Sequence, residues 1–274
     1  MDVCKGIPAF RNQNHKEGWV LMDEPVSKLT KTAAKFTKTE YVFLVKNESV
    51  SVTIREIMDE GYGLYVWPSS KVLAEYVATN PQLFKDNRIL EIGCGTSLPG
   101  ILAAKLGAQV TLSDAALYPH VLDNAKAIIS DNSLASRCQV LPLTWGQFEI
   151  EDKAIPSAER SSCSLSFSVP TPPTFDLIIA ADVFYDVRDY DNLFSTLYWL
   201  NTPLLTVYQE RGETRAHVHK LLVKWDMQLT LLPLKGLDCL DDLREEFEMW
   251  LIRRRKSRLA PLTSIAPVRL NEDS

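Results

Sequence analysis

Short apolar runs alternate with stretches of helical periodicity along most of the chain. The run Phe175–Asp182 is almost continuously apolar, which is typical of a strand buried on both faces of a parallel sheet. Apolar residues in 119–131 recur instead at helical spacing. The pattern predicts strands over 88–92, 108–113, 139–143, 175–182, 203–208, 227–233 and 246–253, and helices over 97–106, 119–131, 189–200 and 213–225. This alternation predicts an α/β fold with a doubly wound, Rossmann-like sheet of seven strands.

Two further elements are predicted before this alternation begins. Residues 41–45 and 50–54 are rich in β-branched and aromatic side chains, and the polar segment 46–49 separates them. That combination predicts a β-hairpin. A helix is predicted over 69–79, because Pro68 and the serines after it are favourable at a helix start.

Composition divides the chain into one domain and three segments without regular structure. Residues 1–38 are polar and charged, and we expect a mobile arm there. Residues 149–174 end in a proline-rich stretch and are expected to form an insertion loop. Residues 254–274 are expected to form a disordered tail. The domain, with the hairpin at its N-terminal end, is therefore predicted over 39–253.

A glycine turn follows the first strand of the predicted sheet. Gly93, Cys94 and Gly95 separate the strand over 88–92 from the next helix. Two glycines flank one residue where the backbone turns sharply and a ligand approaches it, because a Cβ would be in the way. The second strand ends at Asp114, about 20 residues later, and an acid at that spacing binds ribose hydroxyls in nucleotide-binding βαβ units. The sequence therefore predicts a nucleotide-type cofactor.

The turn differs from the dinucleotide-binding pattern. The third glycine of Gly-x-Gly-x-x-Gly would fall at Leu98, whereas the next glycine is Gly100, and Glu91 precedes the turn. Glu-x-Gly-x-Gly followed by Pro-Gly resembles motif I of the class I methyltransferases that use S-adenosylmethionine (SAM). SAM carries one ribose and a methionine tail with an ammonium group but no pyrophosphate. Acids such as Glu91 and Asp114 suit it better than they suit NAD.

Further motifs narrow this resemblance. Trp67-Pro-Ser, Leu143-Thr-Trp-Gly146 and Ala181-Asp-Val-Phe-Tyr185, together with the glycine turn, look like the methyltransferase-like lysine methyltransferase group of the seven-β-strand SAM enzymes, over roughly residues 58 to 252. The resemblance implies SAM as the cofactor and a class I methyltransferase sheet. It also implies a set of cofactor-lining residues: Trp67, Gly93, Cys94, Gly95, Asp114, Trp145 and Ala181, to which the glycine motif adds Glu91. Flat indole rings suit this use, because they can wall adenine or face a sulfonium cation.

The resemblance places Asp182 and Tyr185 beside the methyl group and its acceptor, which it implies is a protein side-chain nitrogen. Two acceptors stay open. The greatest similarity within the family is to a member for which histone arginine methylation is implied and in which we expect Phe at position 185. The Asp-x-x-Tyr motif instead implies lysine chemistry. A guanidinium stays charged and needs carboxylates that hold it as a fork. Asp182 is one candidate and Glu210 is a second, although a solvated helix start also explains Glu210.

Two other functions compete with this one. A NAD-dependent oxidoreductase is disfavoured by Leu98 and by the lack of a substrate domain. A SAM-binding scaffold without catalysis is disfavoured by the combination of Asp182 and Tyr185 with the acids of the cofactor motif. The histidines are scattered along the chain, so no metal site is expected.

Composition limits the partners. The formal net charge of −5 over 274 residues gives no basic field for direct contact with nucleic acid. A protein substrate, either a histone or another basic protein, is expected instead. The sequence leaves the oligomeric state open.

Cysteine usage and hydropathy limit the compartment. The five cysteines are scattered, which suits free thiols in a reducing compartment. No apolar run approaches the length that crosses a membrane, and the N-terminus lacks a signal peptide. We expect a cytoplasmic protein, a nuclear protein or both. The basic cluster 253–258 is either a nuclear signal or a basic edge after the last strand.

Overall fold

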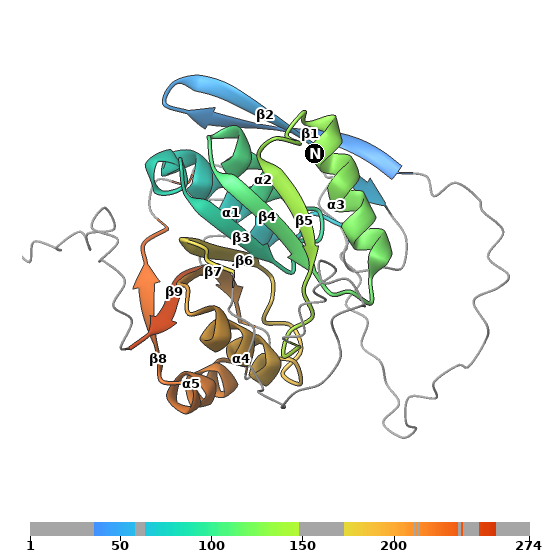
Figure 1. The fold of residues 1–274 in the computed structure, drawn as a ribbon. Coiled ribbons are helices and arrows are strands. Elements are labelled where there is room, and N and C mark those ends of the chain that lie inside the picture. Colours follow the sequence, from blue (N-terminus) through green and yellow to red (C-terminus); the bar gives the residue numbers. More distant parts are fainter. Residues whose placement is uncertain are drawn as a thin grey trace, which may run out of the picture. The chain divides into compact units, whose positions relative to one another are not determined.

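The computed structural model describes residues 36–57, 64–147, 173–210, 212, 214–234, 237 and 247–255. All of them lie in the second of the two units into which the chain divides, Lys35–Ser274 (Figure 1). The predicted arm, insertion loop and tail therefore lie almost entirely outside the described residues. The hairpin and the last strand each extend past the predicted domain boundaries, to Phe36 and Arg254.

Seven strands form the main sheet of the described residues. They are β3 (Arg88–Ile92), β4 (Gln109–Asp114), β5 (Cys138–Pro142), β6 (Leu177–Ala181), β7 (Leu204–Gln209), β8 (Met227–Leu232) and β9 (Phe247–Arg254). Their order is β5-β4-β3-β6-β7-β9-β8, with β3 to β7 parallel and β9 antiparallel to both of its neighbours. The predicted doubly wound, seven-stranded α/β sheet is confirmed.

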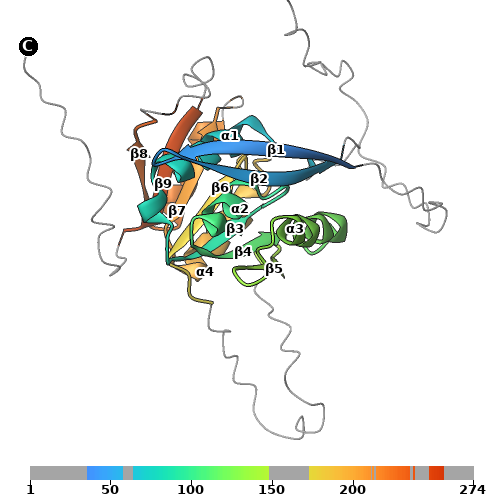
Figure 2. The same cartoon turned by 90° about the horizontal axis from the view of Figure 1, so that it is seen from above.

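Helices cover both faces of this sheet (Figures 1 and 2). One core packs beneath α1 (Pro68–Thr79), α2 (Leu98–Lys105) and α3 (Pro119–Asp131). The other packs beneath α4 (Tyr190–Leu200) and α5 (Thr214–Lys224). Each helix begins and ends close to its predicted limits. Apolar periodicity marks a buried face on α3 and α4, whereas α1 and α2 are buried over most of their length.

The chain reverses direction across the sheet between β3 and β6. From β3 it proceeds to β4 and β5 on one side, and from β6 it proceeds to β7 on the other. The two strands nevertheless pair directly, with Glu91 opposite Ile179. Such a reversal opens a crevice beyond the carboxyl ends of the two strands, where ligands bind in folds of this type. The glycine turn follows β3, and Asp182 follows β6.

The N-terminal hairpin is longer than predicted. It consists of β1 (Phe36–Val45) and β2 (Glu48–Ile57), joined by Lys46 and Asn47, both with positive φ. Positive φ at both loop residues is typical of the tightest hairpin turns. The flanking polar residues belong to the strands, because every second residue faces away from the helices. The hairpin lies across α2 and α3 (Figure 2).

Part of the basic cluster 253–258 is engaged with the domain. The guanidinium carbon of Arg254 lies 3.8 Å from the centre of the Tyr198 ring. Arg255 Nε donates a hydrogen bond to the carbonyl of Met227 at 3.2 Å. These contacts fit a basic edge after the last strand, and residues 256–258 lie outside the described residues. Within the ranges given above, no helix is long and apolar enough to span a membrane.

Candidate active site

The glycine turn after β3 is tightly enclosed. Gly93 and Gly95 have φ values of 58° and 48°, a region that side chains with a Cβ rarely adopt. A Cβ on Gly93 would lie 3.1 Å from Val183 Cγ1 and 3.5 Å from Trp145 Cζ2. The loops after β3, β5 and β6 therefore meet at Gly93, so three separate predicted motifs come together at one point.

Cys94, between the two glycines, turns its side chain into the protein. The residue is buried, and burial raises the pKa of its thiol well above the usual value. Its backbone N–H donates to the carbonyl of Ser113 at 2.9 Å, which ties the turn to β4. A neutral, buried thiol is a poor nucleophile. Cys94 can therefore line a cofactor through its backbone, whereas its buried sulfur is poorly suited to act as a nucleophile.

Glu91 lies beneath the turn and is almost fully buried. Its Oε2 accepts a hydrogen bond from the N–H of Gly100 in the first turn of α2, at 3.1 Å. Burial raises the pKa of this carboxyl well above its usual value, and the hydrogen bond from Gly100 partly opposes that effect. The contact to Gly100 identifies Glu91 as a support for the helix start, in line with helix capping as the alternative to a cofactor role for this acid, and the predicted cofactor role stays a prediction.

Asp114, at the end of β4, faces the glycine turn. Its Oδ2 accepts from the N–H of Gly95 at 3.0 Å, and its Oδ1 accepts from the N–H of Ala115 at 2.8 Å. Burial raises the pKa of Asp114, although both hydrogen bonds act in the opposite direction. A carboxylate offers about four lone-pair sites, so acceptor capacity remains for hydroxyl groups of a ligand.

The two predicted tryptophans occupy different positions. Trp145 is half-buried beside Gly93, and the following Gly146 donates its N–H to Thr196 Oγ1 on α4 at 2.9 Å. Trp67 caps the N-terminus of α1, and its ring meets that of Tyr65 edge-on at 5.5 Å. Sequence reasoning missed Thr196. The available signal was a polar residue on the mostly apolar helix predicted over 189–200.

The segment after β6 carries the remaining predicted residues. Ala181 ends the strand, and Asp182 has a φ of 59°. Phe184 is buried among aromatic rings, including Tyr190 and Trp250 at 5.4 and 5.7 Å between ring centres. Tyr185 is 58% exposed. The segment is therefore anchored by Phe184 and presents Tyr185 outward.

The hydroxyl of Tyr185 stays protonated at ordinary pH. Its pKa is raised to about 12, first by burial of the side chain and then by the negative charges of Asp189 and Asp114. Because more than half of the residue is exposed, the neighbouring carboxylates are the firmer of these causes. The influence of Asp114 indicates only that Tyr185 lies within electrostatic range of that carboxylate.

Glu210 follows β7 and is engaged elsewhere. Its Oε2 accepts from Arg215 Nε at 2.8 Å, and Arg215 also pairs with Glu248 at 2.8 Å. The hydrogen bond from Arg215 lowers the pKa of Glu210. The partner of Glu210 is thus a residue in the first turn of α5, as the alternative of a helix start anticipated. Its predicted role as a second acceptor carboxylate stays a prediction.

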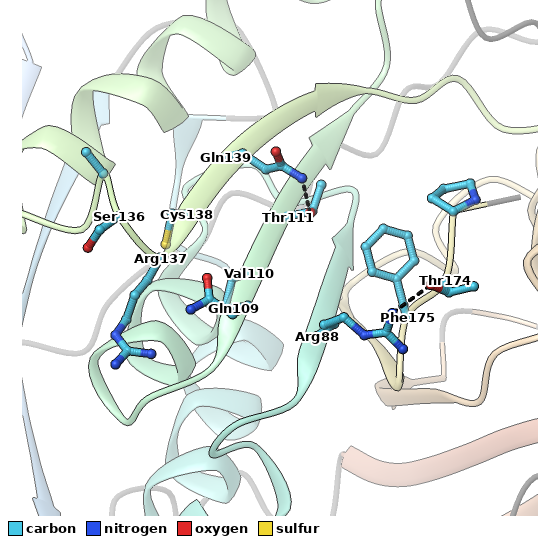
Figure 3. Close-up of a pocket in the computed structure, with 12 residues that line it drawn as sticks. Arg88, Gln109, Val110, Thr111, Ser136, Arg137, Cys138, Gln139, Thr174 and Phe175 are labelled. Atoms are coloured by element: carbon cyan, nitrogen blue, oxygen red, sulfur yellow. Dashed lines mark hydrogen bonds between the residues drawn. The ribbon is translucent and has the colours of Figure 1, made fainter.

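A separate hollow of about 410 Å³ lies at the opposite, amino edge of the strands (Figure 3). It is lined by residues at the starts of β3, β4 and β5 and by the segment before β6. Arg88 there pairs with Asp176 through two hydrogen bonds of 2.9 and 3.1 Å. The hollow contains neither the glycine turn nor the predicted acids, so it is distinct from the candidate site.

Known proteins resemble this chain over most of the described domain. A family described as lysine methyltransferase matches residues 46–161. The histone-arginine methyltransferase METTL23 of Xenopus laevis is 36% identical over 196 residues, covering 70% of this chain and 76% of that protein. The protein-lysine methyltransferase METTL21E of Bos taurus is 37% identical over 129 residues, covering 45% of this chain and 38% of that protein.

Solved structures resemble it more distantly. Magnesium protoporphyrin IX methyltransferase from Synechocystis, solved with bound SAM, is 14% identical, with a TM-score of 0.46 over 68% of this chain and 77% of that chain.

The fold and the relatives together define the class of protein: the chain is a SAM-dependent methyltransferase with a Rossmann-like sheet. It belongs to the lysine methyltransferase family, in which METTL23 and METTL21E are relatives. SAM as the cofactor is thereby confirmed, and the oxidoreductase alternative is excluded. The residues present fit that cofactor, because Gly93 leaves its backbone without a side chain beside Trp145 and Val183 and an acid ends the next strand.

Proposed function

We propose that the chain methylates an arginine side chain of a histone or another basic protein. Support comes from the METTL23 relatives, which are named for histone-arginine methylation and match 70% of the chain. A lysine acceptor is the second candidate, and the shorter match to METTL21E supports it. The acidic residues 238–246, which could attract a basic substrate, lie outside the described residues.

In this proposal the carboxyl ends of the strands hold SAM. Asp114 binds the ribose hydroxyls, and the rings of Trp145 and Trp67 pack against the adenine and the sulfonium. The glycine turn and Ala181 let the cofactor approach the backbone. Glu91 contributes by fixing Gly100, and with it the start of α2, instead of by contacting the methionine tail. When bound, SAM supplies a methyl group on a positively charged sulfur, so the protein contributes mainly placement and electrostatics.

The segment Asp182–Tyr185 forms the acceptor side of the proposed site. The observation that carries this role is the closeness of Val183 to Gly93, where an added Cβ would lie 3.1 Å from Val183 Cγ1, so the segment lies against the glycine turn. Asp182 would accept hydrogen bonds from the substrate nitrogen and orient that nitrogen toward the methyl group. Tyr185 would border the entrance, where its hydroxyl can donate a hydrogen bond because it stays protonated.

One observation favours lysine over arginine. Arginine methylation calls for carboxylates on two sides of the guanidinium, whereas the partner of Glu210 is Arg215. Lysine needs instead a way to lose the proton from an ammonium with a free pKa of about 10.4. A single carboxylate, Asp182, could accept that proton, which suits this second case.

Transfer of labelled methyl from SAM to purified histones and to a mixture of cytosolic proteins would test the proposal. Mass spectrometry of the labelled bands then identifies the modified residue. We expect monomethylarginine or dimethylarginine. An Asp182→Asn variant serves as the control and should transfer no label. Label on lysine alone would refute an arginine acceptor and support the lysine acceptor. Binding of SAM without label in any protein would refute protein methylation.

We also propose a cytoplasmic or nuclear location, in line with the scattered thiols and a basic-protein substrate. Imaging of the tagged chain would test it, with Lys256, Arg258 and their basic neighbours replaced in a second variant. Retention in the secretory pathway would contradict the proposal.

A further inference from the structure

A single carboxylate joins the N-terminal hairpin to the residues before α1. Glu56, near the end of β2, accepts a hydrogen bond from the backbone N–H of Val66 through Oε1 at 3.2 Å. Its other oxygen, Oε2, accepts from the hydroxyl of Tyr41 on β1 at 3.3 Å. One side chain therefore links both strands of the hairpin to the segment that leads into α1.

The segment held by Glu56 carries two aromatic rings that flank the bonded residue. Val66 itself is buried, whereas Tyr65 is exposed and packs edge-on against Trp67. Trp67 also begins α1, where its carbonyl accepts a hydrogen bond from Ser70 at 3.0 Å. Fixing the N–H of Val66 consequently fixes the backbone from which both rings project.

The hairpin is itself a firm support, because separate contacts attach it to α3. Two guanidinium nitrogens of Arg55 donate hydrogen bonds to the two carboxylate oxygens of Asp131. Asn132 donates to the carbonyl of Thr53 at 2.7 Å and accepts from its N–H at 3.0 Å. These bonds lie at the C-terminal end of α3, whereas Asp114 precedes its N-terminus. The hydrogen bonds at the end of α3 and those of Glu56 therefore lie at different places and can be altered independently.

We infer that Glu56 is a positioning residue for the cofactor site: it contacts no cofactor, and it holds Tyr65 and Trp67 in place as one wall of the SAM pocket. The inference rests on the proposed role of Trp67 in that pocket. The hairpin then serves the active site as well as the stability of the domain, and Glu56 is the residue that connects the two.

The matched experiment compares Glu56→Leu with Arg55→Met, two neighbouring residues that hold the hairpin at different places. SAM affinity is measured by calorimetry, well below the unfolding temperature of each variant, and unfolding is measured separately. We expect Glu56→Leu to raise the Kd for SAM about tenfold, because a charged acceptor of a backbone N–H is lost beside the pocket. Arg55→Met should lower the unfolding temperature and leave the Kd within about twofold of the native value.

A conservative variant provides the rescue. Glu56→Gln keeps an oxygen that can accept from Val66, so its Kd should return to within about threefold of the native value. Quenching of tryptophan fluorescence by SAM should be altered in Glu56→Leu and restored in Glu56→Gln. Native affinity in Glu56→Leu would overturn the inference, and so would equal weakening in Arg55→Met, since hairpin stability alone would then explain the loss. A native chain that binds SAM and methylates no protein would refute the proposed acceptor and leave this inference standing.

Discussion

The carboxylate of Glu91 accepts a hydrogen bond from the backbone N–H of Gly100. This bond joins the end of β3 to the first turn of α2, beneath the glycine turn. A Cβ at position 100 would lie 2.1 Å from Glu91 Oε2 and 2.7 Å from Leu112 Cδ2. Glycine is therefore required there for space. The Pro-Gly pair of the motif is explained by this contact, since proline suits the first helical turn and glycine admits the acid.

The raised pKa of Glu91 leads to a prediction about pH. A carboxyl whose pKa is higher in the folded than in the unfolded chain adds stability below the unfolded value of about 4.5, and that stability is lost as the pH rises through the folded pKa. Glu91→Gln keeps the acceptor for Gly100 and removes the charge. We expect the SAM-free variant to be more stable than the native chain at neutral pH, on the order of 1 kcal/mol.

Urea denaturation between pH 5 and pH 9 would measure this difference, which should widen as the pH rises. An identical pH dependence in both chains would show that Glu91 is not the responsible group.

Calorimetry on the same variant also tests the predicted cofactor role. A support for Gly100 predicts a Kd for SAM within about threefold of native, whereas a direct partner of the ammonium predicts a loss of about tenfold or more.

The backbone of Asp182 makes a clean test of its charge possible. Its φ of 59° is one that asparagine also tolerates, so Asp182→Asn removes the charge without disturbing the turn. We expect methyl transfer to fall by about 100-fold or more, with SAM affinity within about threefold, because the group acts on the acceptor side. Asp182→Ala should lose activity similarly and about 1 kcal/mol of stability in addition. Full activity in Asp182→Asn would remove Asp182 from the proposed chemistry.

Glu210 is expected to matter more for α5 than for catalysis. It binds Arg215 in a partly exposed ion pair, and such pairs contribute about 1 kcal/mol or less. Glu210→Gln should therefore lower stability by no more than that and leave kcat within about twofold. Single-turnover assays with the identified substrate would check this. A 100-fold loss would instead make Glu210 the second carboxylate of an arginine site.

The sheet and the meeting of motifs at its edge could be predicted from the sequence. Buried parallel strands such as β6 are continuous apolar runs, and the glycine turn shows where a ligand can approach. The position of β9 between β7 and β8 could not be predicted from the apolar and polar pattern of β9 itself. Alternation between buried Phe247 and half-buried Glu248 shows which face is covered and does not name the neighbouring strand.

Side-chain direction was the other limit. The motif places Glu91 at the end of β3, and the carboxylate then lies beneath Gly100 because α2 begins directly above it. Glu210 falls at the expected edge of the sheet, and its direction is set by Arg215 on the following helix. Glu56 belongs to no motif, and one of its two partners is a backbone N–H. Contacts to backbone groups leave little trace in residue type.

Two glycines with the same backbone region provide the last test. Gly93 and Gly212 have φ values of 58° and 71°, so an alanine at either position should cost about 1–2 kcal/mol in backbone strain. A Cβ at Gly212 would meet no atom of the described residues within 4 Å, whereas at Gly93 it would lie 3.1 Å from Val183 and 3.5 Å from Trp145. Gly93→Ala should therefore weaken SAM binding by about tenfold or more, and Gly212→Ala should leave it unchanged. Calorimetry on both variants, compared at equal distance below their unfolding temperatures, separates crowding from strain. Equal affinities would show that the packing of Val183 and Trp145 at Gly93 does not determine SAM affinity.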